Sequence, residues 1–285
     1  MRIALFTTCI GDALFPDAHK ATALLLTRLG HEVVFPEGQT CCGQMHINTG
    51  YQRETVPIIE SYVDAFNDPS IDYVVAPSGS CAGAVREQHE RIADRYGSKA
   101  LATGAKETAN KTLELTEFLC DVEQRTDLGA WFPHKVTYHA SCHSLRFIKL
   151  GDRPYELLRN VEGLELVELP NSEECCGFGG TFSIKNAEVS AAMVSDKVTN
   201  IRSTGAEYVT AGDSSCLMNI AGALSRQLLV SAPCISLKSW HPRRNTRGPR
   251  KRLHTSERSC CESFTRTTHP APTGFPRSHV LAPAR

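Results

Sequence analysis

The sequence predicts an α/β fold with two pseudo-symmetric lobes, in which parallel sheets are flanked by helices. Short β-rich apolar runs alternate with segments of helical periodicity, a pattern typical of parallel sheets covered by helices. The cysteines recur in two sets with nearly constant spacing, which indicates an internal duplication. Hydrophobic residues make up 41% and charged residues 22% of the 285-residue chain, so a packed core is feasible.

The first lobe is expected to cover residues 1–127. It begins with a predicted strand at Arg2–Thr7 and a helix at Asp17–Leu29, with Asp17 as the N-cap and Gly30 as the C-terminal stop. The later predicted elements of this lobe are the strand His31–Phe35, the helix Thr55–Phe66, the strand Asp72–Ala76, and the helices Ala84–Tyr96 and Leu113–Val122.

The second lobe is expected to cover residues 128–236, with Leu128–Pro133 as the junction. Its predicted elements are strands at Val136–His139 and Glu165–Leu169 and a helix at Ala187–Ile201. Each cysteine or cysteine pair follows a predicted strand by a few residues. Parallel strands end at one edge of their sheet, so distant cysteines should converge on one site per lobe.

Residues 237–285 differ from both lobes and are expected to form a disordered basic tail. From residue 238 onward there are 11 Lys and Arg residues against 2 Asp and Glu, whereas residues 1–237 carry 20 against 29. A nucleic-acid or anionic-membrane contact and an altered carboxyl end are alternatives for this tail. No aromatic interleaving supports nucleic-acid binding, and we do not expect it.

The cysteines of the two sets occupy corresponding places in the two lobes. They lie 133 residues apart for the first cysteine, 134 for the adjacent pair and 135 for the last. The first set is Cys9, Cys41, Cys42 and Cys81, and the second set is Cys142, Cys175, Cys176 and Cys216. A glycine, Gly43 or Gly177, follows each adjacent pair and would allow a sharp turn of the backbone around a shared centre.

Four thiolates complete a metal site, and they are the soft ligands that suit iron–sulfur clusters or zinc. We expect an iron–sulfur cluster of [4Fe-4S] type, one or two per chain, and keep a zinc-stabilised scaffold as the alternative. Cys120 and Cys234 stand outside the registered sets and are interpreted as core residues. Cys260 and Cys261 lack a following glycine and a third partner, so they are not counted as a site.

Polar residues near the cysteines are further candidates. His139, His143 and Arg146 surround Cys142 and are expected to tune a thiolate or bind an anionic substrate, although they could equally be satisfied polar residues at a strand end. Ser78 and Asp213 each precede the last cysteine of their set by three residues. They are interpreted as turn formers, with extra oxygen ligation as the alternative.

No apolar run approaches the ~20 residues of a membrane-spanning helix. The short run at Ile3–Phe6 is also too brief for a secretory signal. We therefore expect a cytoplasmic protein. In a reducing compartment, twelve cysteines favour metal binding or redox chemistry over a disulfide framework.

These motifs resemble the lactate utilization protein A family of cysteine-rich CCG-domain proteins. The resemblance covers about residues 1–230, and its motifs are LFTTC at 5–9, FPEGQTCCGQ at 35–44, YHASCH at 138–143 and ECCGFGGTFS at 174–183. More distant relatives are the iron–sulfur subunit of glycolate oxidase and the catalytic subunit of heterodisulfide reductase. In the wider group the motif closes with C-x-x-C, and here Ser78 and Asp213 occupy the first of those cysteine positions.

The resemblance implies an iron–sulfur electron-transfer component of a multi-protein system that oxidises L-lactate to pyruvate. It also implies two partners, a second iron–sulfur protein and a small third protein. Lactate itself would bind either to this chain or to one of those partners. A heterodisulfide- or thiol-reducing subunit and a glycolate oxidase type of subunit are the enzyme alternatives.

Overall fold

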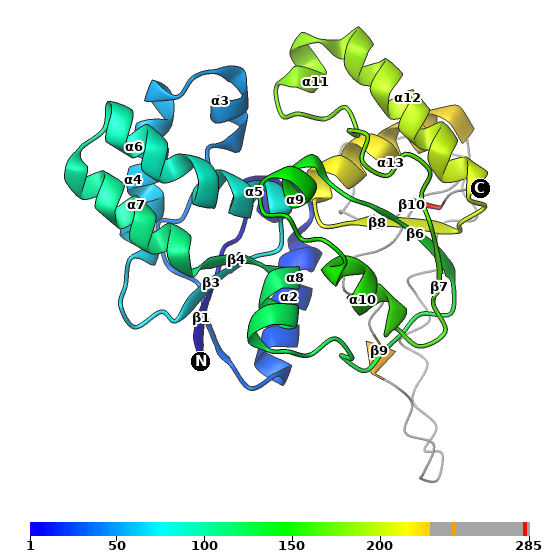
Figure 1. The fold of residues 1–285 in the computed structure, drawn as a ribbon, viewed down its shortest axis with the longest axis horizontal. Helices are drawn as coiled ribbons and strands as arrows, with labels where there is room; N and C mark the ends of the chain where they lie inside the picture. Colours follow the sequence, from blue (N-terminus) through cyan, green and yellow to red (C-terminus); the bar gives the residue numbers. More distant parts are fainter. Residues whose placement is uncertain (229–240, 243–281, 284–285) are drawn as a thin grey trace, which may run out of the picture.

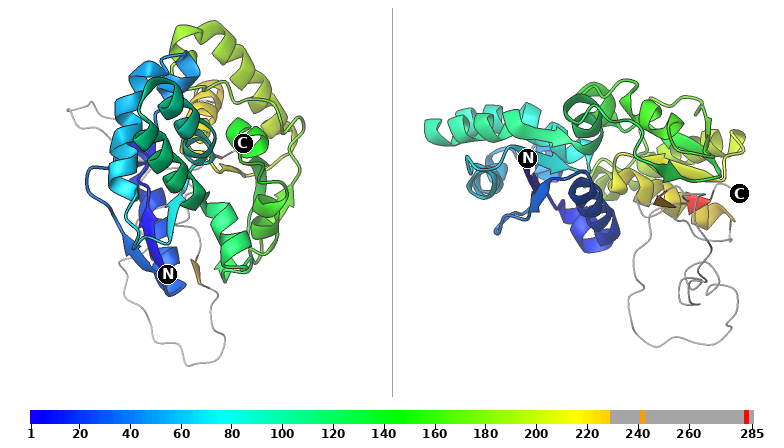
Figure 2. Two further views of the ribbon diagram at one scale, coloured as in Figure 1. Left: turned by 60° about the vertical axis from the view of Figure 1, so that its left-hand side comes forward. Right: turned by 90° about the horizontal axis from the view of Figure 1, so that it is seen from below.

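The computed structural model describes residues 1–228, 241–242 and 282–283 of the chain. These residues fold into two lobes, each built around a four-stranded sheet that helices flank (Figure 1). Two further views show the lobes side by side (Figure 2). The predicted α/β class with two similar lobes is confirmed, while the boundaries at residues 127 and 236 remain predictions.

The sheet of the first lobe is entirely parallel. Its strands are β1 (Arg2–Leu5), β2 (Glu32–Val34), β3 (Tyr73–Ala76) and β4 (Thr112–Glu114), in the spatial order β2-β1-β3-β4. Ile3 pairs with Val33 on one side and with Tyr73 on the other. The first three strands were predicted from their apolar runs, whereas β4 overlaps the start of the helix predicted at Leu113–Val122.

The sheet of the second lobe repeats this arrangement. Its parallel strands are β6 (Lys135–His139), β7 (Glu165–Val167) and β8 (Tyr208–Ala211), and the sheet order is β10-β8-β6-β7. The order β7-β6-β8 matches the order β2-β1-β3 of the first lobe, as a duplicated chain requires. β10 (Ala282–Pro283) joins the edge antiparallel to β8.

The helix α2 (Pro16–Arg28) shows where the predicted helix signals hold and where one fails. Phe15 is its N-cap, so Asp17 lies inside the first turn and the predicted capping role of Asp17 is wrong. Proline is favoured at the first helical position because its missing N–H has no partner there in any case. Gly30 follows the helix with φ +95°, as predicted for a C-terminal stop.

The other helices of the first lobe include the predicted ones, but α1 and α3 were not predicted, and two further differences appear. The predicted helix Ala84–Tyr96 begins earlier, because α5 (Gly79–Ala84) continues through a π-helical segment, η2 (Val85–His89), into α6 (Glu90–Tyr96). The helix α7 was not predicted. The remaining helical segments are α1 (Cys9–Leu14), α3 (Gln44–Thr49), η1 (Arg53–Thr55), α4 (Val56–Phe66), α7 (Lys99–Lys111), α8 (Leu115–Glu117) and η3 (Phe118–Val122).

In the second lobe, α12 (Ala187–Ser203) matches the predicted helix at Ala187–Ile201. The long helix α13 (Ser214–Leu228) after the last strand was not predicted. The shorter helices are α9 (Cys142–Arg146), α10 (Arg153–Arg159) and α11 (Phe182–Lys185). Helix α11 has only four residues.

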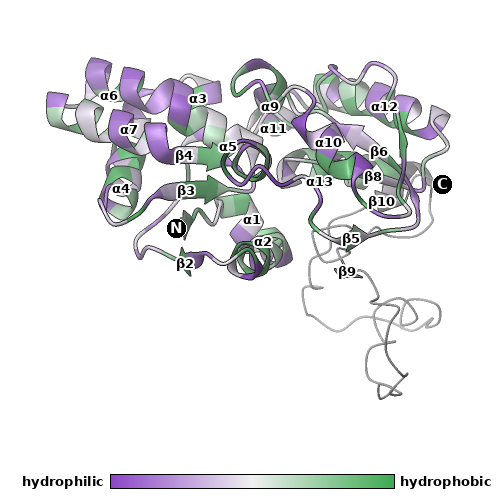
Figure 3. Ribbon diagram, turned by 60° about the horizontal axis from the view of Figure 1, so that its bottom comes forward, coloured by the Kyte–Doolittle hydropathy of each residue, from purple (hydrophilic) through white to green (hydrophobic). Residues whose placement is uncertain are grey.

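Apolar residues between sheet and helices form the core of each lobe. In the first lobe the ring of Phe6 packs edge-on against Tyr62 and Phe66, with centroids 5.2 and 5.5 Å away. Colouring by hydropathy shows β3 as hydrophobic and hydrophilic turns on α6 and α7 (Figure 3). This burial holds the strand ends, and with them the cysteines, in place.

The two lobes meet through helices that follow corresponding strands. Helix α5 of the first lobe packs against α9 of the second, and α1 packs against α13. Figure 1 shows α5 and α9 together at the centre of the molecule. By the duplication α1 corresponds to α9 and α5 to α13, so the two contacts are equivalent and the lobes are related by a pseudo-two-fold axis.

The predicted junction contains β5 (Ala130–Trp131), which pairs antiparallel with β9 (His241–Pro242). The predicted tail, residues 237–285, lies outside the described residues apart from β9 and β10. The prediction of disorder there is therefore not tested. Cys234, Cys260 and Cys261 also lie outside the described residues.

Candidate metal centre

The first cysteine set gathers at the carboxyl end of the sheet, as predicted. Cys9 begins α1 a few residues after β1, and Cys81 lies in α5 after β3. The Sγ atoms of Cys9 and Cys41 are 3.4 Å apart. Cys42 is hydrogen bonded to both Cys41 and Cys81, so the four thiols form one continuous group. All four line one hollow in the protein.

The second set gathers in the same way. The thiol of Cys175 is hydrogen bonded to Cys142 and to Cys176. Cys176 in turn is bonded to Cys216, which closes the group of four. Cys176 is 2% exposed, like Cys42 in the first lobe. The two sets therefore agree in their order of contacts as well as in their sequence spacing.

One thiol in each set is surrounded by hydrogen-bond donors. Cys42 and Cys9, together with the backbone N–H of Gly43 at 3.3 Å, lower the pKa of Cys41. Hydrogen bonding to Cys41 and burial raise the pKa of Cys9. In the second set Cys142, Cys176 and the N–H of Gly177 lower the pKa of Cys175 in the same way. A thiolate at this position is the form that binds a metal ion.

The glycine after each pair has the predicted role in the turn. Gly43 has φ +78°, and a Cβ there would lie 2.6 Å from Cγ2 of Thr55. Gly177 has φ +83°, and its Cβ would lie 2.6 Å from the carbonyl oxygen of Ser190. A larger residue would thus have both a strained backbone and a steric clash. The glycines allow two adjacent cysteines to face one centre.

Two polar side chains that the sequence did not single out hold the backbone of the cysteine pairs. The Nε2 atom of His89 lies 2.9 Å from the carbonyl oxygen of Cys42. Asn219 Nδ2 donates to the carbonyl oxygen of Cys176 at 2.8 Å. His89 is on η2 and Asn219 on α13, and they are 47 and 43 residues away in sequence from the cysteines that they contact. No local sequence signal could have identified them.

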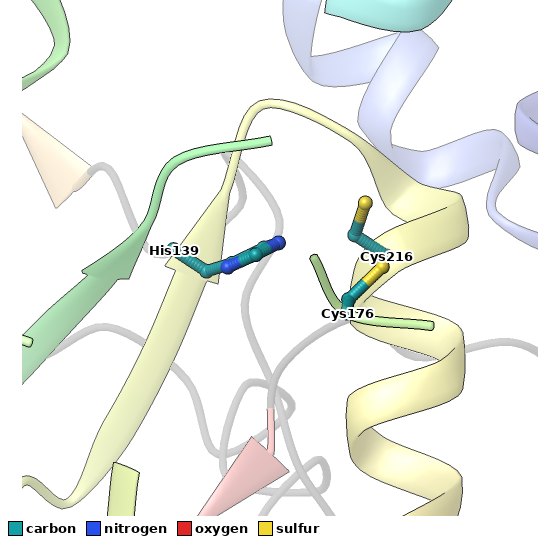
Figure 4. A group of neighbouring side chains, drawn as sticks. All are labelled: His139, Cys176 and Cys216. Carbon is teal, nitrogen blue, oxygen red and sulfur yellow. The ribbon is translucent and has the colours of Figure 1, made fainter. Parts of the chain in front are cut away.

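The structure separates the three polar candidates beside Cys142. His139, at the end of β6, is completely buried next to Cys176 and Cys216, with one ligand atom from each residue within 4.8 Å of the others (Figure 4). Burial first, and then the charge of Lys197, lower the pKa of His139 to about 4. His143 stacks on Phe147 at 4.8 Å, away from this group.

Arg146 is exposed, and its Nη2 atom donates to the carbonyl oxygen of Glu173 at 3.4 Å. Its charge still contributes to a lower pKa for Cys142, although burial and the neighbouring thiols raise that pKa overall. Burial also lowers the pKa of His143. Of the three candidates, His139 is the one that directly faces the thiols of the second set.

Ser78 and Asp213 are directed toward each other across the lobe interface. The hydroxyl of Ser78 donates to Oδ1 of Asp213 at 2.7 Å, and the backbone N–H and hydroxyl of Ser80 donate to the same oxygen at 3.0 and 2.7 Å. Ser141 donates to the other oxygen. Ser78 is also the N-cap of α5, which agrees with its interpretation as a turn former. Asp213 instead joins the lobes.

The lobe interface also brings residues of the second lobe close to the first cysteine set. Phe178, Ser214 and Ser215 of the second lobe line the hollow around the first set. The hydroxyls of Thr49 and Thr181, which follow the two cysteine pairs, lie 2.5 Å apart. Each set is therefore close to residues of the other lobe. Cys120, by contrast, packs in a hydrophobic cluster, as predicted.

The donor set fits an iron–sulfur centre. Each lobe offers four thiols linked by successive contacts, a glycine turn that keeps backbone out of the way, and an N–H directed at a sulfur. Metal binding would replace the thiol protons that now bridge neighbouring sulfurs. The same four thiols also satisfy the coordination of zinc, so the donor set alone does not choose the metal.

Two pseudo-symmetric lobes with matching cysteine sets define a protein of two cysteine-rich domains. The model of the CCG cysteine-rich domain family matches residues 3–86 and 136–221, one copy per lobe. No helix within residues 1–228 combines the length and the apolar character that a membrane crossing requires.

Curated relatives narrow this class. The chain is 46% identical over 227 residues to lactate utilization protein A of a Geobacillus species, which covers 80% of this chain and 93% of that protein. It is 47% identical over 225 residues to the protein of the same name from an Exiguobacterium species, covering 79% and 91%. The corresponding values for Oceanobacillus iheyensis are 46% over 227 residues, with 80% and 91% covered. The chain belongs to the lactate utilization protein A family.

Proposed function

We propose that this chain is an iron–sulfur protein that carries electrons within a multi-protein system oxidising L-lactate to pyruvate. Two centres of [4Fe-4S] type are held, one per lobe, by the sets Cys9, Cys41, Cys42 and Cys81, and Cys142, Cys175, Cys176 and Cys216. The observation that carries this proposal is the gathering of eight thiols into two groups of four at corresponding places.

The chemistry of lactate oxidation agrees with two centres. Conversion of lactate to pyruvate releases two electrons and two protons, and an iron–sulfur centre of this type stores one electron at a time. Two centres in one chain match the two electrons released. The name of the relatives supports lactate as the source of the electrons. The partners in this proposal are a second iron–sulfur protein and a small third protein.

The ligand assignment is tested by anaerobic purification followed by counting of iron and acid-labile sulfide. Cys42→Ser and Cys176→Ser should each remove one centre and about half of the iron, because each removes one of four ligands. Cys120→Ser is the matched control, since Cys120 is a half-buried cysteine outside both sets. Unchanged iron in both ligand variants would contradict the assignment. Zinc in place of iron would favour the scaffold alternative.

The electron-transfer role is tested with both partner proteins present. Addition of L-lactate should bleach the visible absorption of the iron-loaded chain, and omission of either partner should prevent this. A chain that is reduced by dithiol substrates and oxidised by disulfides, but does not respond to lactate with its partners, would support the thiol-reductase alternative instead.

A further inference from the structure

His139 is a buried polar side chain whose hydrogen-bonding capacity is unused. It is 0% exposed, and neither ring nitrogen has a hydrogen-bond partner within the part of the chain that the structure describes. A buried polar group without a partner destabilises the folded state, so it calls for an explanation. Most buried side-chain polar atoms in proteins have such a partner.

The surroundings of His139 indicate what this partner is. The ring lies at the end of β6 and points toward the thiols of Cys176 and Cys216 (Figure 4). A neutral imidazole carries one N–H donor. In the proposed function, the sulfur atoms of the second centre lie on this side of the ring. An N–H directed at them would be satisfied only when the centre is present.

The first lobe has no such donor at the corresponding place. Cys9 and Cys142 are 133 residues apart, and the same offset makes Phe6 the equivalent of His139. Phe6 packs against Tyr62 and Phe66. His89 of the first lobe does not replace it, because its Nε2 atom is bonded to the carbonyl oxygen of Cys42. The two cysteine sets are therefore alike, but their surroundings differ in polarity.

A second polar residue increases this difference. Gly43 lies close to Thr55, and Gly177 lies close to Ser190, so Thr55 and Ser190 are equivalent positions of the two lobes. They are 135 residues apart, and the same offset makes Tyr62 the equivalent of Lys197. Lys197 is 0% exposed, and its Nζ atom donates to the carbonyl oxygens of Asn171 and Ser172 at 2.7 and 3.4 Å. The first lobe thus has two aromatic rings where the second has an imidazole and an ammonium group.

We propose that His139 donates its N–H to a sulfur of the second centre and, with the nearby Lys197, raises the reduction potential of that centre above that of the first. This inference rests on the proposed function. Reduction adds negative charge, which N–H donors and a positive charge stabilise, so both act in the same direction. When one electron is shared between the centres, the first is oxidised and the second is reduced.

The test is a redox titration of the iron-loaded chain, followed by electron paramagnetic resonance. Cys42→Ser and Cys176→Ser identify which signal belongs to which centre, and the second centre should have the higher potential. His139→Phe gives the second lobe the aromatic ring of the first. It should weaken the electron affinity of the second centre about tenfold, or about 59 mV for a one-electron couple, and leave the first unchanged.

Further variants separate hydrogen bonding from structural damage. His139→Gln keeps an N–H donor and should retain most of the potential, whereas Lys197→Met should lower it as His139→Phe does. His134→Phe is the matched control, because His134 precedes β6 at the opposite end of the strand and packs against Phe132 and Tyr208. It should change neither potential.

Three results would overturn the inference. The first is an unchanged reduction potential of the second centre in both His139→Phe and Lys197→Met, and the second is an equal shift in the potentials of both centres. The third is loss of the second centre in His139→Phe and His139→Gln while both variant proteins remain folded. The last result would make the ring an iron ligand. A wild-type chain without iron–sulfur centres would instead contradict the proposed function, so the two failures are distinguishable.

Discussion

Glu114 gives the sharpest prediction about stability, because its carboxyl group is buried and forms no ion pair with any residue that the structure describes. It ends β4 and is 3% exposed, and its side chain accepts hydrogen bonds from the side chain of Thr116 and from its N–H, the latter at 2.6 Å. A Cβ on Gly212 of the second lobe would lie 3.9 Å from its Oε1 atom. Burial, and to a smaller extent the nearby Glu117 and Asp213, raise its pKa to about 8.

The direction in which pH changes the stability of the fold follows from proton linkage. The unfolded chain releases this proton near the ordinary pKa of 4.5, while the folded chain keeps it up to about pH 8. The folded state therefore binds more protons between these values, and its stability falls as the pH rises through that window. This rise in pKa corresponds to about 5 kcal/mol at most, and to a loss of about 3 to 4 kcal/mol between pH 5 and pH 8.

Replacing Glu114 by glutamine removes the proton but keeps an acceptor for Thr116. Unfolding by urea should show that the free energy of unfolding of Glu114→Gln, relative to that of the wild type, rises by about 3 kcal/mol between pH 5 and pH 8. Glu188→Gln, at an exposed position on α12, is the matched control and should follow the wild type. The iron content of all three proteins is measured at each pH, so that loss of a centre is not mistaken for the effect.

Infrared spectroscopy supplies a second readout that does not depend on reversible unfolding. The wild type should show a protonated carboxyl band at pH 7 that Glu114→Gln lacks and that titrates near pH 8. If the two proteins lose stability in parallel and the band is absent, the carboxyl is ionised in the folded state. Burial would then not keep Glu114 protonated at neutral pH.

Two further substitutions test the lobe interface and the glycine turn. Asp213→Ala leaves the N–H of Ser80 without its acceptor and should lower the free energy of unfolding by about 2–4 kcal/mol, seen as a lower urea midpoint. Asp213→Asn should lose less stability. Equal midpoints for Asp213→Ala and the wild type would contradict this role. Gly177→Ala should lose iron from the second centre. Gly151→Ala is the control, because Gly151 has a similar φ of +62° but a Cβ there would have no atom within 4 Å, and this variant should retain its iron. Equal iron in both variants would show that the close approach of Gly177 to Ser190 is unimportant.

The sequence allowed prediction of those features that repeat along the chain or depend on local pattern. The strands before the cysteines are apolar and β-rich, and the shared edge of parallel strands explains why residues as distant as Cys9 and Cys41 meet. By contrast, β4 has only three residues, Thr112–Glu114, and a single aliphatic side chain. So short a run carries no periodicity that could distinguish a strand from the helix predicted there.

The contacts between lobes could not be predicted, because a sequence pattern does not specify how two similar units are oriented. Asp213 and Ser78 are 135 residues apart, and nothing local to either residue indicates that they are bonded. His89 shows the same limit within one lobe, since its contact with Cys42 depends on how η2 packs behind the cysteine pair. The nearness of His139 to two thiols was predictable in part, because it shares a motif with Cys142.

The bond between Ser78 and Asp213 has a further meaning, because the two residues occupy equivalent positions. The offset of 135 that relates Cys81 to Cys216 also relates Ser78 to Asp213. In a symmetric pair, equivalent residues contact each other only at the two-fold axis. Their 2.7 Å hydrogen bond therefore marks the pseudo-two-fold axis of the molecule.

Two identical lobes could not make this bond between a hydroxyl donor and a carboxylate acceptor. Two aspartates at the axis would place like charges in contact, which destabilises at least one of them, and two serines would offer the N–H of Ser80 a weaker, uncharged acceptor. Joining both lobes in one chain allows the two positions to differ. The same freedom allows His139 in one lobe and Phe6 in the other, so the two matching cysteine sets have different surroundings. In the proposed function, such a difference would favour electron transfer from the first centre to the second, which a symmetric dimer of a single lobe could not provide.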